Sequence, residues 1–220
     1  MARTKRESFA TPLSQTEPMD ISERKKELRR HYSSKRTALD TTYVQSASQE
    51  ICDNLLRLIR DRHADTVLLF HPIKNEPDLR SLVSILNREG ICTAFPISVT
   101  EPVGLDFHVV ADVNDMEVGT YGIREPDKYA PMPKISSRSV CVVPALAYDR
   151  YGFRLGYGKG FYDRFLADFD GVSVGITYDG FIADKLPRDR YDLCVDTIIT
   201  ERGVILPDEI DKSIICPEKT

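Results

Sequence analysis

Two short apolar runs with a helical pattern between them constrain the fold more than any other feature of the chain. The runs, at residues 66–70 and 91–95, are too short for helices and are strand-like. Between them, apolar residues recur every three or four positions, as on one face of a helix, and Gly90 marks the end of that pattern. A strand, a helix and a strand in this order predict parallel strands joined by a right-handed crossover.

Two helices are predicted before this unit. The first begins at Asp20, where Glu23 completes the pattern of a capping box, and it carries many basic residues. The second begins near Thr42, with Gln45 in the equivalent position, and its apolar residues recur at helical spacing. Because these apolar residues share one face, the second helix should pack against a sheet.

The second half of the chain supplies further strands. Its predicted elements are, in order, a strand at 139–143, a helix at 161–166, a strand at 172–177 and a strand at 194–200. Residues 98–137 are rich in Pro, Gly, Asp and Glu, which indicates long loops around one strand at 105–109. We therefore predict an α/β fold: a single domain with a mainly parallel central sheet and helices on both faces.

Composition and charge limit the setting of this domain. We place the domain at residues 20–208, between a disordered N-terminal extension at 1–19, rich in Ser, Thr, Pro and charge, and a C-terminal tail at 209–220. The formal net charge of −4 argues against a nucleic-acid partner, and no apolar run is long enough to cross a membrane. Five cysteines without a C-x-x-C pair, and no secretory leader pattern, indicate reduced thiols and a cytoplasmic location.

A glycine-rich loop after the strand at 139–143 is the most informative stretch of the chain. Four glycines and two interleaved cations fall within nine residues: Gly152, Arg154, Gly156, Gly158, Lys159 and Gly160. Ligands of open α/β sheets bind beyond the carboxyl ends of the strands, and glycines there let backbone N–H groups approach an anion. The loop and the start of the following helix therefore predict a phosphate cradle. A tight turn that only requires positive φ is the alternative.

This loop matches neither of two familiar phosphate-binding motifs. Its spacing lacks the G-x-G-x-x-G of dinucleotide-binding folds, and the chain contains no G-x-x-x-x-G-K-[ST]. Asp163 follows in the first turn of the next helix, where a carboxylate could hold Mg²⁺ beside phosphates. The alternative for Asp163 is a carboxylate favoured there by the helix dipole alone.

The loop and its surroundings resemble the signature of the 5-formyltetrahydrofolate cyclo-ligases, also called methenyltetrahydrofolate synthetases. The resemblance rests on VPALAYD, on RLGYGKGFYDRFL from Arg154 to Leu166, on K-x-x-L-R at Lys25 to Arg29, on Glu76 after the first strand, on GIREP at 122–126 and on a closing segment at 174–201. These motifs follow in the family's order and span roughly residues 25–201.

The resemblance implies a monomeric or weakly associating α/β enzyme with small-molecule partners, a reduced folate and ATP. Such an enzyme uses ATP as co-substrate, with Mg²⁺, to convert 5-formyltetrahydrofolate to 5,10-methenyltetrahydrofolate, a step of one-carbon metabolism that releases ADP and phosphate. The γ-phosphoryl group is expected to activate the formyl oxygen before the ring closes. Phosphoryl transfer needs positioning and charge neutralisation more than a nucleophilic side chain.

The resemblance also implies roles for individual residues. Residues expected to bind ATP are Lys25, Arg29, Arg154, Gly156, Tyr157, Gly158, Lys159, Gly160, Phe161 and Tyr162. Arg154 and Lys159 are the expected catalytic residues, Asp163 and Asp192 the expected Mg²⁺ ligands, and Glu76 and Tyr162 the expected folate contacts.

Without the family, these residues have plainer explanations. The spacing of Lys25 and Arg29 puts both on one helix face, which could simply be solvated. Glu76 could be a solvated loop charge, and Phe161 or Tyr162 could anchor its helix in the core. A nucleotide- or folate-binding relative with a regulatory role, or a phosphosugar-handling enzyme on a similar scaffold, are the alternative functions.

Three positions depart from the usual family pattern. Leu79 stands where threonine is usual, Phe181 where glutamine is usual, and Tyr191 where histidine or asparagine precedes the aspartate. All three lie outside the glycine loop. We therefore expect any difference from the family to concern the folate end of the site.

Overall fold

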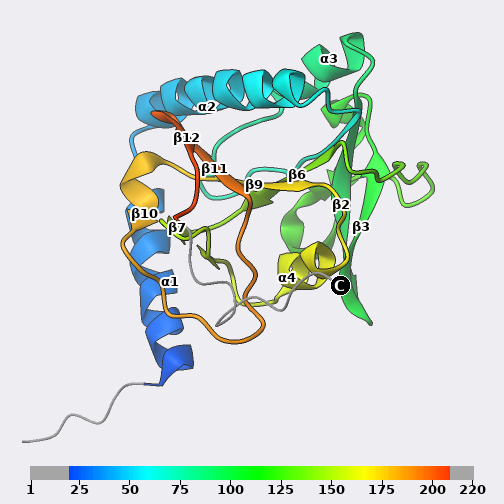
Figure 1. Cartoon of the computed structure of the whole chain (residues 1–220). Helices are drawn as coiled ribbons and strands as arrows, with labels where there is room; N and C mark the ends of the chain where they lie inside the picture. The colour runs from blue at the N-terminus through cyan, green and yellow to red at the C-terminus, as the bar shows by residue number, and fades with distance from the viewer. Residues whose placement is uncertain (1–19, 209–220) are drawn as a thin grey trace, which may run out of the picture.

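A seven-stranded sheet runs through the centre of the molecule (Figure 1). Its strand order is β12 (Gly203–Ile205), β11 (Thr197–Thr200), β9 (Val172–Ile176), β6 (Ser139–Pro144), β1 (Thr66–Leu68), β2 (Cys92–Thr100) and β3 (Val103–Val109). This computed structural model describes residues 20–208, so the predicted extension at 1–19 and tail at 209–220 lie outside the described residues. The inner pairings are parallel, which confirms the predicted mainly parallel sheet, and each edge strand pairs antiparallel.

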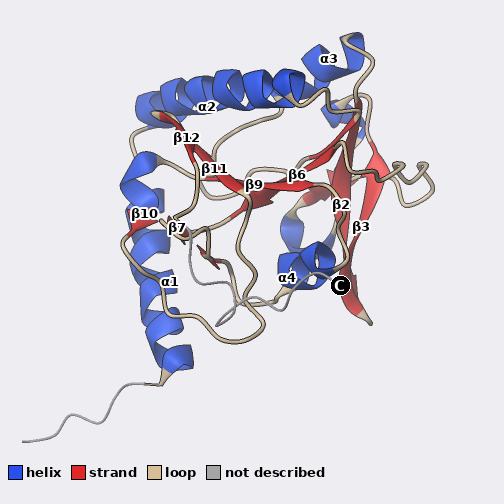
Figure 2. Cartoon of the chain, viewed as in Figure 1, coloured by secondary structure: helices blue, strands red, loops and turns tan. Residues whose placement is uncertain are grey.

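Four α-helices accompany the sheet in the described part of the chain. They are α1 (Ile21–Thr37), α2 (Thr41–Asp61), α3 (Ser81–Arg88) and α4 (Phe161–Ala167). Figure 2 shows α2 and α3 on one side of the sheet and α4 on the other. Strand residues alternate between these sides, so that Val140 and Val142 join the core under α2 while Cys141 and Val143 join the core under α4. The prediction of helices on both faces is confirmed.

The start of α2 differs from the prediction. Asp40 is its N-cap, and the Asp40 carboxylate accepts hydrogen bonds from the backbone amides of Thr42 (2.8 Å) and Tyr43 (3.3 Å). The capping box predicted at Thr42 and Gln45 is therefore wrong, because an aspartate two residues earlier already satisfies the first amides. Helix α1 does begin after Asp20, but that side chain makes no capping hydrogen bond.

Residues 98–137 hold more regular structure than predicted. Strand β2 continues to Thr100 and forms a long hairpin with β3, and a small sheet pairs β4 (Glu117–Val118) with β5 (Arg124–Glu125). The outer half of the hairpin is only partly buried, so its sequence lacks the apolar run by which a strand is recognised. Short 3₁₀ turns lie at Val113–Asp115 and Thr120–Gly122.

A three-stranded sheet of β10 (Ile182–Ala183), β7 (Ala147–Asp149) and β8 (Arg154–Leu155) leads from the end of β6 to the glycine-rich loop. A 3₁₀ turn at Asp179–Phe181 precedes β10. The chain therefore leaves the central sheet, makes a short hairpin from β7 to β8, and enters the loop before α4. This path places the loop beyond the carboxyl end of β6, where ligands of α/β sheets bind.

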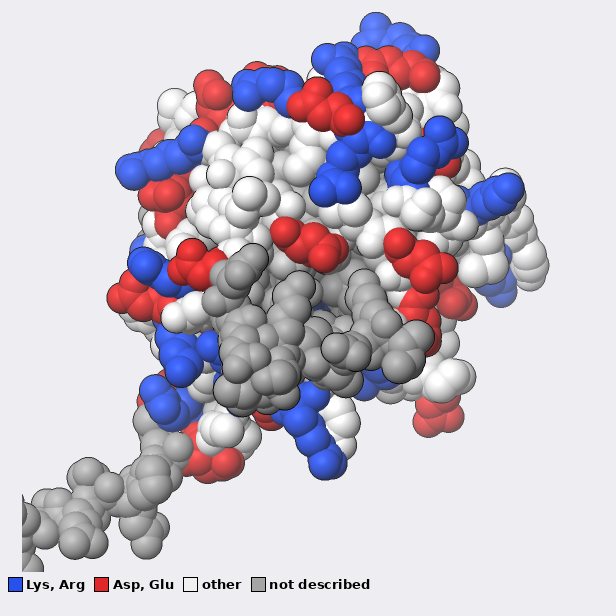
Figure 3. Space-filling model, viewed as in Figure 1, with Lys and Arg blue, Asp and Glu red and all other residues white. Residues whose placement is uncertain are grey.

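The surface agrees with the near-neutral composition. On the face drawn in Figure 3, basic and acidic side chains of the described residues are interspersed. Among residues 20–208, no helix has both the length and the apolar character needed to cross a membrane. The described cysteines Cys52, Cys92, Cys141 and Cys194 form no disulfide with one another.

Candidate active site

A cavity of about 1230 Å³ lies at this end of the sheet. Its walls come from α1, the loop between β1 and α3, the β2–β3 hairpin, the glycine-rich loop with α4, and residues 189–193. Every residue with an expected ATP, folate, catalytic or Mg²⁺ role lines it, whereas Gly152 at the start of the glycine-rich loop does not. These lining residues are Lys25, Arg29, Glu76, Arg154, Gly156, Tyr157, Gly158, Lys159, Gly160, Phe161, Tyr162, Asp163 and Asp192. The fold thus gathers segments from distant parts of the chain into one cavity.

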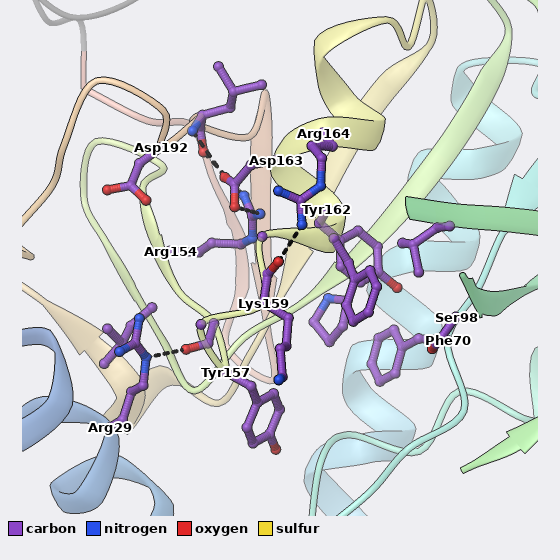
Figure 4. Close-up of a pocket in the computed structure, with 18 of the residues that line it drawn as sticks. Arg29, Phe70, Ser98, Arg154, Tyr157, Lys159, Tyr162, Asp163, Arg164 and Asp192 are labelled. Carbon is purple, nitrogen blue, oxygen red and sulfur yellow. Dashed lines mark hydrogen bonds and ion pairs between the residues drawn. The ribbon is translucent and has the colours of Figure 1, made fainter. Parts of the chain in front are cut away.

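Arg154 is held in a fixed position on one wall. Its guanidinium forms an ion pair with Asp163 (2.9 Å) and donates to the carbonyl of Leu193 (3.3 Å). The Leu193 amide donates in turn to the Asp163 carboxylate (3.2 Å), as the dashed lines of Figure 4 show. The Arg154 side chain is only 6% exposed and lies 6.0 Å from the centre of the Tyr162 ring. Strand β8, helix α4 and the 189–193 loop therefore fix this cation together.

Helix α1 contributes two more cations. The Lys25 ammonium pairs with Asp192 (2.5 Å) and Asp189 (2.8 Å), and the Arg29 guanidinium donates to the carbonyl of Gly156 (2.9 Å). Burial alone would lower the pKa of Lys25, but the two carboxylates outweigh it and raise that pKa above its ordinary value. Both side chains point to the cavity from one helix face, and neither is merely solvated.

The glycine-rich loop needs a glycine at position 158. Gly158 has a φ of +92°, and a Cβ placed on it would lie 3.1 Å from the Cζ atom of Arg29. Any other residue there would be strained and would press on the Arg29 guanidinium. Gly158 therefore packs closely against Arg29 of α1 and also lines the cavity.

The two aromatic residues after the loop, Phe161 and Tyr162, make different contacts. Tyr162 lines the cavity and also packs against the core under α4, and burial raises the pKa of its hydroxyl well above the ordinary value. Phe161 packs edge-on against Tyr121, with 6.4 Å between ring centres. The Lys159 ammonium lies 6.0 Å from the same Tyr121 ring. Figure 4 shows the side chains of Lys159 and Tyr157 at the same wall of the cavity.

Glu76 is buried, so the alternative of a solvated loop charge does not hold. Its Oε1 lies 3.2 Å from an Arg36 nitrogen and accepts a hydrogen bond from the Tyr157 hydroxyl (3.2 Å), while Oε2 accepts one from the Ile73 amide (3.1 Å). Burial raises the pKa of this carboxyl, and Arg36 counteracts the rise. Arg36 was not predicted as a site residue, although positions 25, 29 and 36 share one helix face.

Another part of the cavity wall is largely apolar, and most of it was not predicted from the sequence. Phe70, Ile73, Pro96, Leu105, Ile123 and Pro144 line this wall. His71 and Glu125 also line the cavity, and Glu125 accepts a hydrogen bond from the Ser98 amide (3.0 Å). Much of this wall belongs to the β2–β3 hairpin and residues 117–125, which the sequence indicated to be mostly loops.

The three departures from the family pattern lie in different places. Tyr191 lines the cavity and is largely exposed. Leu79 and Phe181 are each 1% exposed and belong to the core under α2. Two of these changes therefore concern packing, and only Tyr191 can touch a ligand of the cavity as the described residues stand.

Each of the two predicted metal ligands is paired with a cation. Asp163 pairs with Arg154 and Asp192 with Lys25, and the described residues contain no group of three or more His, Cys, Asp or Glu side chains that could hold a metal ion. Mg²⁺ commonly binds through one or two carboxylates and the phosphates of a substrate, and two cavity carboxylates fit that mode.

Comparison with known proteins agrees with the motifs. A model of the 5-formyltetrahydrofolate cyclo-ligase family matches residues 21–201. The 5-formyltetrahydrofolate cyclo-ligase of Mycolicibacterium smegmatis is 29% identical over 147 residues, covering 64% of this chain and 76% of that protein. The enzyme of the same name from Escherichia coli K12 is 28% identical over 179 residues, covering 77% and 96%.

Solved structures show the same likeness. The NMR structure of Aquifex aeolicus 5,10-methenyltetrahydrofolate synthetase is 31% identical, with a TM-score of 0.74, and the match covers 84% of this chain and 94% of that one. A 5,10-methenyltetrahydrofolate synthetase from Mycoplasma pneumoniae shares the fold at 24% identity and a TM-score of 0.65, covering 80% and 98%.

Proposed function

The chain belongs to the 5-formyltetrahydrofolate cyclo-ligase family, and from this premise we propose that it converts 5-formyltetrahydrofolate to 5,10-methenyltetrahydrofolate with ATP and Mg²⁺. The observation that carries the proposal is that the residues to which the family resemblance assigns a binding or catalytic role all line one cavity. A cytoplasmic location, a monomeric state and the absence of nucleic-acid and membrane partners stay predictions.

Two groups of cavity-lining residues suit two different ligands. Lys25, Arg29, Arg154 and Lys159 gather around the glycine-rich loop, where a polyphosphate would find cations and backbone donors. The apolar wall with the buried Glu76 suits a flat ring system that carries N–H donors. A volume of about 1230 Å³ exceeds that of most single-ligand sites, which supports simultaneous binding of ATP and a folate.

The reaction then proceeds in two balanced steps. The formyl oxygen attacks the γ-phosphorus of ATP, the bond to the β-phosphate oxygen breaks, and ADP leaves. The nitrogen at position 10 of the folate then attacks the activated formyl carbon and loses its proton. The bond between that carbon and the phosphorylated oxygen breaks and releases phosphate. The formyl oxygen therefore ends in the phosphate.

The chain's residues position and neutralise charge in this scheme. Arg154, fixed by Asp163 and Leu193, would face the transferring phosphoryl group, and Lys159 would approach it from the loop. Asp163 and Asp192 would hold Mg²⁺ with the phosphates. Bound there, the cation would neutralise phosphate charge. No side chain has to act as a nucleophile.

Turnover itself tests the proposal. The purified chain with 5-formyltetrahydrofolate and Mg-ATP should produce the absorbance of the methenyl product together with ADP, and omission of ATP should stop both. Binding of both ligands without ADP release would support a non-catalytic relative instead. Conversion of a sugar phosphate without ATP would support the phosphosugar alternative.

Asp163→Asn should reduce turnover by about 100-fold or more, because the variant loses both the ion pair that orients Arg154 and a ligand for the cation. The Mg²⁺ concentration needed for half-maximal rate should rise. Asp168→Asn on the C-terminal end of α4 is the control and should behave as wild type. Wild-type Mg²⁺ dependence in Asp163→Asn would contradict the assignment.

Gly158→Ala should raise the KM for ATP by roughly 10-fold, because its Cβ would press on Arg29 and strain the loop. Gly90→Ala is a matched control: Gly90 also has a positive φ (+74°), but a Cβ there meets nothing within 4 Å. Both variants should lose about 1 kcal/mol of stability to backbone strain. Only Gly158→Ala should change the KM for ATP, which steady-state kinetics would show.

A further inference from the structure

Arg36 is a buried cation with no place in the scheme so far. It lies on the last turn of α1, its side chain is 3% exposed, and it is not among the residues that line the cavity. A buried guanidinium is costly unless its donors are satisfied. Its neighbours should therefore explain its presence.

The Arg36 guanidinium joins four segments of the chain. It donates to the carbonyls of Lys74 (3.0 Å) and Ala145 (2.9 Å) and to the Tyr157 hydroxyl, and it lies 3.2 Å from Oε1 of Glu76. Helix α1, the loop before α3, the end of β6 and the glycine-rich loop thus meet at one side chain. Its planar fork suits this task, because several donors are held in fixed directions.

These contacts hold the Glu76 carboxylate in one orientation. Oε1 pairs with the Arg36 guanidinium and accepts a hydrogen bond from the Tyr157 hydroxyl, and Oε2 accepts one from the Ile73 amide. The carbonyl of Lys74, two residues before Glu76, is held by the same guanidinium. Glu76 lines the cavity while Arg36 does not, so Arg36 supports the carboxylate on the side away from the ligand.

We propose that Arg36 is a positioning residue for folate recognition: it keeps the Glu76 carboxylate oriented so that it can accept hydrogen bonds from the ring N–H groups of a folate. The inference rests on the proposed function, since it takes Glu76 as the folate contact. Arg36 does not touch the folate. Its loss therefore acts through Glu76 and affects folate more than ATP.

The test is direct binding of 5-formyltetrahydrofolate and of ATP, measured by titration calorimetry on the full chain without turnover. Arg36→Met should weaken folate binding by roughly 10- to 100-fold, the range expected when a buried charged hydrogen-bond partner is lost. Arg36→Lys keeps the positive charge but not the planar guanidinium with its several donors, and should lose less folate affinity than Arg36→Met. ATP affinity should change by no more than about 3-fold in either variant, because the nucleotide cations stay in place. Arg30→Met, an exposed position of α1, is the control and should bind both ligands as wild type.

A double-mutant cycle separates positioning from general damage to the fold. If Arg36 acts through Glu76, adding Arg36→Met to Glu76→Gln should cause no further loss of folate affinity. Equal losses with and without Glu76, or equal losses for folate and ATP, would overturn the inference. If Arg36→Met does not fold, the same cycle with Arg36→Lys decides the question. Wild-type protein that binds no folate would overturn the proposed function itself, whereas wild-type folate affinity in Arg36→Met would overturn this inference alone.

Discussion

Replacing Arg154 with alanine should abolish turnover, with a fall in kcat of about 10³-fold or more, as when an arginine that stabilises a transferring phosphoryl group is lost. Arg154 is 6% exposed, and its only described ion-pair partner is Asp163 at 2.9 Å. The variant therefore loses a cation that is already held in position, before the reaction, to stabilise the negative charge of the transition state. ATP should still bind, because Lys25, Arg29 and Lys159 remain.

Rapid-quench measurement of ADP formation, with ATP binding measured separately, would check this prediction. Arg150→Ala is the matched control, since Arg150 forms an exposed ion pair with Asp184 and does not line the cavity. Arg154→Lys should restore only part of the rate, because lysine cannot reproduce the paired contacts to Asp163 and Leu193. A kcat for Arg154→Ala within about tenfold of wild type would remove Arg154 from the catalytic role.

Glu76→Gln should raise the KM for 5-formyltetrahydrofolate by roughly 10- to 100-fold and leave the KM for ATP nearly unchanged. Glutamine keeps the shape of the side chain but offers one acceptor oxygen instead of two, and it loses the charge that pairs with Arg36. The variant should also lose about 1–3 kcal/mol of stability, because the Arg36 guanidinium stays buried without its anion.

Steady-state kinetics with each substrate varied in turn would check this split, and thermal unfolding would check the stability. Glu89→Gln is a suitable control, because Glu89 pairs with Arg60 on the surface and does not line the cavity. Equal increases in both KM values would mean that Glu76 supports the whole site. An unchanged folate KM would show that Glu76 does not contact the folate.

The fold could be predicted where apolar periodicity is strong. The parallel strands β1, β6 and β9 are almost fully buried, so each is a continuous apolar run. Strand β2 was predicted as far as Phe95 and β3 from Leu105, but the half-exposed outer parts of both strands and their pairing as a hairpin were missed. Strand β12 was missed because a three-residue antiparallel edge strand leaves little pattern. Helix α2 was predicted, but its capping residue was not.

The site could be predicted where its residues are close together in the sequence. The glycine-rich loop with Arg154 and Asp163 forms one continuous motif, and residues 154–163 of it line the cavity. Arg36 could not be singled out, since it is one of many cations in the most basic helix and only tertiary contacts bury it. The burial of Glu76 was hidden by its polar neighbours Lys74, Asn75 and Asp78.

Oxygen tracing tests the central claim most directly. The chain should be given 5-formyltetrahydrofolate labelled with ¹⁸O in the formyl group, together with unlabelled Mg-ATP in unlabelled water. If the formyl oxygen is phosphorylated in this cavity, each methenyl product should be matched by one ADP and one phosphate that carries ¹⁸O. Unlabelled phosphate, with the ¹⁸O released to water, would show that ATP is hydrolysed without activating the formyl group and would contradict the account.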